Sequence, residues 1–301
     1  TGIADSRQRY TVPGLIAVGA SVVNAVGTWL VLQWGCRSVG LVAFNIGTGV
    51  LALVLNMIYC FAGLRARLNL RGGWDGALCR SLFAFSWWLL LNQLINMLNA
   101  GTGNYLVAVT LGADAAAVYT CGLQIYANYF LLGGCLAQLF LPRVVGLVVR
   151  GASPTVQTEA MARLGRVQLL ILLPVAVVLL FYGQQFFELW VGHKLGEQAR
   201  LSWLIAVALV VPQTFSLVQA LGWQISQARN ALRQRVAITA FNSALFIVVS
   251  YFVCLWWGIA AQALWAAISI TIQLLMLNLI HYRGLGLSPR RFYARTFAGW
   301  Y

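Results

Sequence analysis

Three asparagines, Asn92, Asn96 and Asn99, are the residues of this 301-residue chain whose type and spacing could do chemistry. They recur at i, i+4 and i+7, so they share one face of a helix. A carboxamide can donate and accept hydrogen bonds in one place, which suits ligands that carry hydroxyl groups. The surrounding stretch, Phe83–Leu111, is apolar and long enough to cross a bilayer, where an unpartnered amide costs about 2–7 kcal/mol. That face must therefore meet protein or a water-filled cavity.

A second apolar segment, residues 115–141, carries polar side chains at a similar depth, namely Thr120, Gln124 and Asn128. Trp88 could stack on the face of a sugar ring. Two interpretations stay open: the side chains line a substrate cavity, or they bond across helices for about 0.6–2 kcal/mol each. The candidate substrate-cavity residues are Trp88, Asn92, Asn96, Asn99, Thr120, Gln124 and Asn128.

Catalytic and metal-binding patterns are missing from the sequence. The six cysteines are scattered, with no CxxC pair and no partnered histidine, so we expect neither a metal site nor a disulfide framework. No apolar segment or short loop pairs a histidine with an acid, or two acids, as general acid–base catalysis requires. We therefore expect no cofactor, no metal, no catalytic residue and no enzyme activity.

The composition predicts an all-α polytopic membrane protein, because 61% of the residues are hydrophobic and only 9% are charged. Eight apolar segments are long enough to be transmembrane helices. A short surface helix is expected to begin near Ser153 and Pro154, before the fifth segment. The eight segments are residues 12–33, 39–63, 82–111, 115–141, 167–190, 201–223, 236–257 and 259–282.

The net charge is +14, and the positions of the Lys and Arg residues predict the membrane topology. All but three of the 20 Lys and Arg residues lie before the first segment, after the last one, or in alternate connections; the exceptions are Arg37, Lys194 and Arg200. Cytoplasmic loops hold the excess of basic residues, so both termini of this chain are predicted to be cytoplasmic. The basicity also favours contact with anionic membrane lipid, and we expect no nucleic-acid partner.

An internal repeat suggests the domain organisation. The pattern Arg7-Gln8-Arg9, with the two helices after it, matches Arg233-Gln234-Arg235 and its two helices, although chance agreement is the alternative. If the repeat is true, residues 1–63 are the last two helices of a first lobe. The other four helices of that lobe are then expected before Thr1, and the chain alone should not support transport. Residues 64–81 are then a cytoplasmic linker and residues 82–283 a six-helix second lobe. Residues 284–301 form a basic cytoplasmic tail that is either interfacial or solvated.

Several stretches resemble a known family. Three such stretches are LFAFSWWLLLNQLINMLNAGTGNYLVAVTLGADAAAVYTCGLQI, FYGQQFFELWVG and ISQARNALR. In that order they resemble the seventh and eighth helices, the ninth helix, and the loop after the tenth helix of the polysaccharide and O-antigen flippases. These flippases belong to the multidrug/oligosaccharidyl-lipid/polysaccharide exporter superfamily, which shares a two-lobe, twelve-helix fold with the MATE drug exporters. The resemblance implies a MATE-like helical bundle that flips a lipid-linked oligosaccharide, a polyprenyl diphosphate sugar, across the bacterial inner membrane. Alternating access between two lobes would serve surface polysaccharide or lipopolysaccharide biosynthesis, and the resemblance implies other polysaccharide-assembly proteins as partners.

Two other function classes remain open beside the flippase. One is a MATE-type multidrug exporter on the same fold, and the other is an integral membrane enzyme of polysaccharide assembly. The chain lacks the cationic cavity residues of the superfamily's lipid II flippases, since no Lys or Arg lies near the centre of any segment. The same segments hold no carboxylate or histidine at mid-depth, so we expect the six-helix lobe to contribute no coupling proton.

Overall fold

The computed structural model describes residues 11–33, 38–63, 76–140, 146, 150–228, 232–284, 286 and 289–298. Almost all of these residues are helical, and none of them lies in a strand. The chain divides into two compact units, residues 1–75 and 76–301, which are described separately below. Several helices are long and apolar enough to cross a membrane. The prediction of an all-α polytopic membrane protein is therefore confirmed.

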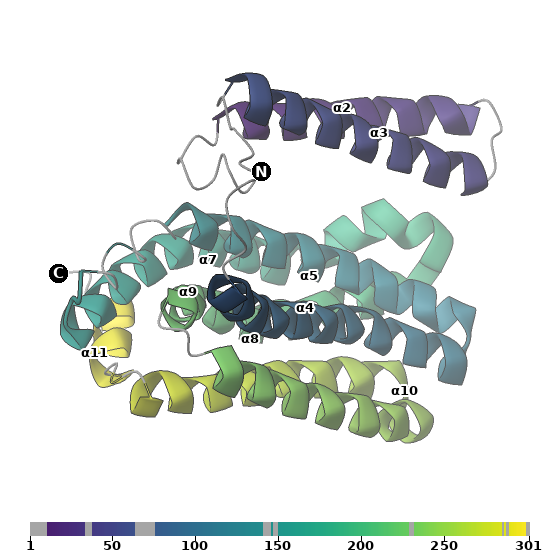
Figure 1. The fold of residues 1–301 in the computed structure, drawn as a ribbon. Coiled ribbons are helices and arrows are strands. Elements are labelled where there is room, and N and C mark those ends of the chain that lie inside the picture. Colours follow the sequence, from purple (N-terminus) through teal and green to yellow (C-terminus); the bar gives the residue numbers. More distant parts are fainter. Residues whose placement is uncertain are drawn as a thin grey trace. The chain divides into compact units, whose positions relative to one another are not determined.

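The first unit is a helical hairpin (Figure 1). Helix α2 (Thr11–Gln33) lies beside α3 (Ser38–Ile58), and a π-helical turn, η1 (Tyr59–Gly63), continues α3. Most of the large apolar side chains of both helices are exposed. Apolar side chains that face outward around a helix pair are expected where the surroundings are lipid rather than water.

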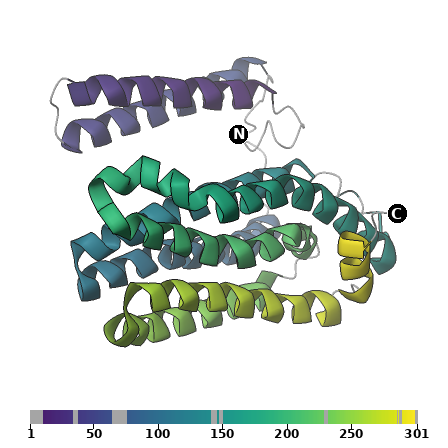
Figure 2. The same cartoon turned by 180° about the vertical axis from the view of Figure 1, so that it is seen from behind.

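The second unit is a helical bundle (Figures 1 and 2). Its long helices are α4 (Gly76–Leu111), α5 (Ala113–Leu139), α7 (Pro154–Leu195), α8 (Ala199–Val218) and α10 (Leu232–Gly284). Shorter pieces are η2 (Gly196–Gln198), α9 (Ala220–Ala228), α11 (Pro289–Tyr293) and η3 (Ala294–Ala298). Helix α10 is in fact two helices that fold back on each other, because Gly258 has a φ of 74° that a side chain would disfavour.

All eight predicted segments fall on helices of the structure, within the described residues, although Gln219 divides the segment 201–223 between α8 and α9. The expected surface helix near Pro154 is not separate, however, since α7 runs without a break for 42 residues. At about 1.5 Å per residue it is about 63 Å long, roughly twice the hydrocarbon thickness of a bilayer. Met161, Ala162 and Gly165 are buried in its first half, so packing holds this amphipathic part in the same helix as the apolar part.

Among the residues that the structure describes, five helical runs meet the length and composition expected of membrane spans, and two of them, 154–218 and 232–279, contain a break. Helix α5 is not among the five, although its 27 residues could cross a bilayer. Its polar residues Thr120, Gln124 and Asn128 lower its mean hydropathy. Helix α5 thus carries three of the seven candidate residues, and these polar side chains keep it outside the set of apolar runs.

Packing of α5 against α8 decides which face of α5 is left open. A Cβ atom on Gly122 would lie 2.8 Å from the carbonyl oxygen of Ser202, so the glycine permits a close helix contact. The Ser202 hydroxyl donates a hydrogen bond to the Val118 carbonyl at 2.9 Å and fixes the same contact. Val118 and Ile205 are buried beside it in one apolar cluster. The opposite face of α5 carries the candidate residues.

Candidate functional site

The polar face of α5 is exposed. Thr120, Gln124 and Asn128 follow one another at intervals of four residues, so they lie on one side of the helix. All three side chains are exposed, whereas Val118 and Gly122 on the other side are buried against α8. Their spacing and exposure thus place these three residues on one open face of α5.

Helix α4 brings a further amide to the same level. The two helices are joined at Gly112, whose φ of 91° allows a tight turn, and they run antiparallel. The Thr120 hydroxyl donates a hydrogen bond to Asn104 Oδ1 at 2.9 Å across the pair. Asn96 and Asn128 each lie eight residues from this bond, so an equal rise of 1.5 Å per residue puts them at the same depth. We call Asn96, Gln124 and Asn128 the amide wall.

The hydrogen-bonding capacity of the amide wall is mostly unused. Asn128 Nδ2 donates to the backbone carbonyl of Gln124 at 2.9 Å. Within the part of the chain that the structure describes, the side-chain amides of Asn96 and Gln124 make no hydrogen bond. Each amide therefore has donors and an acceptor available for a ligand or for water.

Asn99 and Thr120 form hydrogen bonds between helices. Asn99 Nδ2 donates to the hydroxyl of Ser243 on α10 at 2.7 Å, so Asn99 links two helices. Asn96 and Asn99 point about 60° apart on α4, because each residue turns a helix by about 100°. Thr120 is held by Asn104, as described above. The predicted asparagine stripe is thus split between an interhelical contact and the amide wall.

The remaining predicted residues, Trp88 and Asn92, are half-buried on α4. Neither side chain makes a hydrogen bond among the described residues. Asn92 lies one turn and Trp88 two turns from Asn96, toward the start of α4, so they extend its face without adding to the exposed amides. Gln93, which the candidate set omits, is exposed beside Asn96, and its amide type and its position three residues away are the signal for it.

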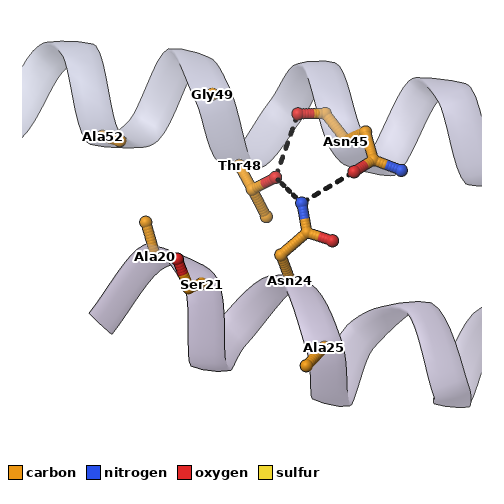
Figure 3. Close-up of a pocket in the computed structure, with 8 residues that line it drawn as sticks. All are labelled: Ala20, Ser21, Asn24, Ala25, Asn45, Thr48, Gly49 and Ala52. Carbon is orange, nitrogen blue, oxygen red and sulfur yellow. Dashed lines mark hydrogen bonds between the residues drawn. The ribbon is translucent and has the colours of Figure 1, made fainter. Parts of the chain in front are cut away.

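The helical hairpin of the first unit holds a polar cluster that the candidate set also missed (Figure 3). Asn24 Nδ2 on α2 donates to Asn45 Oδ1 at 2.7 Å and to the hydroxyl of Thr48 at 3.1 Å, both on α3. A shallow groove of about 400 Å³ runs along this contact and is lined by Ala20, Ser21, Asn24, Ala25, Asn45, Thr48, Gly49 and Ala52. Polar residues three to four positions apart between small ones were the sequence signal for it.

The bonds inside this cluster leave it little to offer a ligand. The oxygen Asn24 Oδ1 accepts from the Thr28 hydroxyl at 3.1 Å, and Asn45 Nδ2 donates to the Leu41 carbonyl at 2.8 Å. Thr48 in turn donates to the Asn45 carbonyl at 3.0 Å (Figure 3). The cluster therefore fastens α2 to α3, in contrast to the amide wall of the second unit.

The amide wall lies in a neutral part of the second unit. The only charged residues of α4 and α5 are Arg80 and Asp114, each within the first turns of its helix. Among the described residues, no three His, Cys, Asp or Glu side chains lie close enough together to hold a metal ion. The arrangement can thus bind neutral hydrogen-bonding groups, through three amides on two adjacent helices.

Comparison with protein families gives a match, which covers the amide wall. A family model described as polysaccharide biosynthesis protein matches residues 16–200, which is more than half of the chain and includes every residue of the amide wall. Comparisons with curated proteins and with solved structures give no match. By the extent of the family match, the chain belongs to the polysaccharide biosynthesis protein family, as a multi-pass membrane protein.

Proposed function

We propose that this protein flips a lipid-linked oligosaccharide, a polyprenyl diphosphate sugar, across the bacterial inner membrane for surface polysaccharide biosynthesis. The observation that carries the proposal is the amide wall: three exposed amides at matched depth on two long helices of a membrane protein in this family. Exposed amides are costly against lipid, so a polar ligand or water is the expected neighbour of this face.

The chemistry of the wall suits a glycan. Sugar hydroxyls both donate and accept hydrogen bonds, and a carboxamide offers both functions with no net charge. Each such bond contributes about 0.5–1.5 kcal/mol net, so a few of them hold a sugar without trapping it. The lipid tail would remain in the bilayer while the sugar crosses, and two helical lobes in a MATE-like bundle would alternate access.

Transport rather than catalysis is the activity that these residues support. The wall contains no acid, base or nucleophile, and the sequence pairs none in its spans. We therefore propose a translocase and not an enzyme, with both termini of this chain in the cytoplasm and with O-antigen or lipopolysaccharide precursors as one class of substrate. Other polysaccharide-assembly proteins would supply the lipid-linked sugar and polymerise it after it has crossed.

Depletion of the protein in its host separates the candidate functions. A flippase predicts that surface polysaccharide is lost while lipid-linked oligosaccharide accumulates in the cytoplasmic leaflet, protected in spheroplasts from an added glycosidase. A MATE-type drug exporter predicts unchanged polysaccharide and greater sensitivity to toxic cations. A membrane enzyme of the pathway predicts a precursor that accumulates on the outer leaflet, where the glycosidase digests it. Either of the last two results would contradict the proposal.

A further inference from the structure

The second unit is closed at one end by a short C-terminal segment, residues 289–298, which we call the strap. It consists of α11 and η3, and it packs on the first half of α7 (Figure 2). Phe292 and Thr296 of the strap have no exposed surface. Phe292 lies in an apolar cluster with Met161 and Leu169 of α7 and with Ile225 of α9. The strap is therefore part of the folded bundle, although the sequence suggested an interfacial or solvated tail.

One strap residue, Tyr293, joins two other helices. Its hydroxyl accepts a hydrogen bond from Gln219 Nε2 at 2.7 Å and a second from Asn278 Nδ2 of α10 at 3.2 Å. Gln219 and Asn278 are both buried, and among the described residues their side-chain oxygens have no partner. The hydroxyl of Tyr293 thus meets two buried amide groups, from residues 59 positions apart in the chain.

Gln219 is the residue at which the helix breaks. Helix α8 ends at Val218, Gln219 has non-helical backbone angles (φ −98°, ψ 9°), and α9 begins at Ala220. A break between two helices is a place where one can move relative to the other. Helix α9 is also held to α10, because the Arg235 guanidinium lies 4.5 Å from the centre of a Trp223 ring. The strap hydrogen bond acts at the break itself.

An ion pair holds the strap to α7 at the surface. Arg295 Nη1 lies 2.6 Å from Glu159 Oε1, and more than half of each side chain is exposed. Exposed ion pairs contribute little to stability because water and salt screen them. The buried ring of Phe292 and the hydrogen bonds of the Tyr293 hydroxyl with the buried residues Gln219 and Asn278 therefore do more than the ion pair to keep the strap in place.

We infer that the strap is a latch on the α8–α9 break: while Tyr293 bridges Gln219 and Asn278, α9 is fixed, and release of the strap lets α9 move. The inference concerns a motion inside the second unit and does not depend on what the protein transports. Removal of the hydroxyl takes away the partner of two amide donors, those of Gln219 and Asn278. One unmet buried donor favours local opening about 5- to 150-fold, so we expect opening to be favoured at least about 5-fold. Opening of this kind exposes backbone amides to solvent without unfolding the bundle.

Hydrogen exchange of the purified full chain, followed by mass spectrometry, tests the latch. Tyr293→Phe keeps the ring and deletes only the hydroxyl. We expect exchange to become faster in peptides that cover 219–228 and 289–298, and to stay unchanged in α5. Tyr251→Phe is the matched control, because Tyr251 is exposed and its hydroxyl makes no hydrogen bond among the described residues. This control should leave exchange unchanged everywhere.

Two results would overturn the latch. One is unchanged exchange over 219–228 in Tyr293→Phe, and the other is equally faster exchange throughout the bundle, which is general destabilisation. If Tyr293→Phe does not fold, Asn278→Ala is used instead, because it removes one of the two donors to the same hydroxyl. Gln273→Ala is its control, since the Gln273 amide makes no hydrogen bond among the described residues. The latch then predicts faster exchange over 219–228 and 289–298 in Asn278→Ala alone, and no difference between the two variants would refute it.

Discussion

At the scale of single residues, exposure and bonding divide the amides of this protein into two kinds. Asn24 and Asn99 each donate to a neighbouring helix, at 2.7 Å to Asn45 and at 2.7 Å to Ser243. Asn96 and Gln124 are exposed and make no side-chain hydrogen bond among the described residues. Residue type alone could not separate the two kinds, because partner distance depends on how the helices pack.

Asn24→Leu should weaken the helical hairpin of the first unit. The change removes the bonds to Asn45 and Thr48, and interhelical bonds of this kind contribute about 0.6–2 kcal/mol each in membranes. The separation of α2 from α3 during SDS titration, reported by a fluorophore pair with one dye on each helix, measures the loss. Asn56→Leu is the matched control, because among the described residues Asn56 Nδ2 bonds only to the Ala52 carbonyl of its own helix. Equal stability of the two variants would show that the cluster does not fasten the hairpin.

At the scale of helices, the sequence predicts the position of a helix well where the length of an apolar segment determines it. The ranges 12–33 and 82–111 fall on α2 and α4, because a segment of about 20 apolar residues has to be helical in a bilayer. The reversal at Gly258 was also expected between the last two segments, and the positive φ of the glycine gives its physical cause.

Where tertiary contacts decide, the sequence was a poor guide. The polar start of α7 and the basic strap look like surface segments when each is considered alone. In the structure they bury one another: Met161 and Phe292 have no exposed surface, and Thr296 packs near Gly165. The side-chain contacts that fix these segments come from residues more than 100 positions apart, which no local pattern reports.

The candidate site was predictable in part for the same reason. The four-residue spacing of Thr120, Gln124 and Asn128 was enough to place them on one face of α5. The division of Asn96 from Asn99 was not visible, because both fall within a narrow arc of α4 and only the position of Ser243 separates them. The cluster around Asn24 was overlooked, although its polar residues lie three to four positions apart on each of the two helices.

At the scale of the whole molecule, the charge distribution predicts the topology. All but three of the 20 basic residues fall in connections on one side of the eight segments. In a cysteine-free background, Arg37→Cys should react with a membrane-impermeant thiol reagent added outside intact cells. Arg150→Cys, an exposed position in a connection of the opposite side, should react only after permeabilisation. The reverse pattern would contradict cytoplasmic termini.

The central claim is that the amide wall contacts the sugar that is moved, and transport by three matched variants tests it most directly. Asn96→Leu, Asn128→Leu and Asn99→Leu are introduced into the full-length protein in its host, and surface polysaccharide is divided by the amount of protein in the membrane. Loss of a buried partner for a sugar hydroxyl costs about 1–3 kcal/mol, so substrate affinity should fall roughly 5- to 150-fold in the first two variants.

Asn99→Leu is the internal control, because Asn99 bonds to Ser243 and not to the open face. It should lower the amount of folded protein, while transport per molecule at limiting substrate stays close to that of the unmodified protein. Contact between the amide wall and the sugar predicts this separation between the wall variants and the interhelical variant. Normal transport per molecule in both Asn96→Leu and Asn128→Leu would contradict it, and the wall would then be a surface that the substrate does not touch.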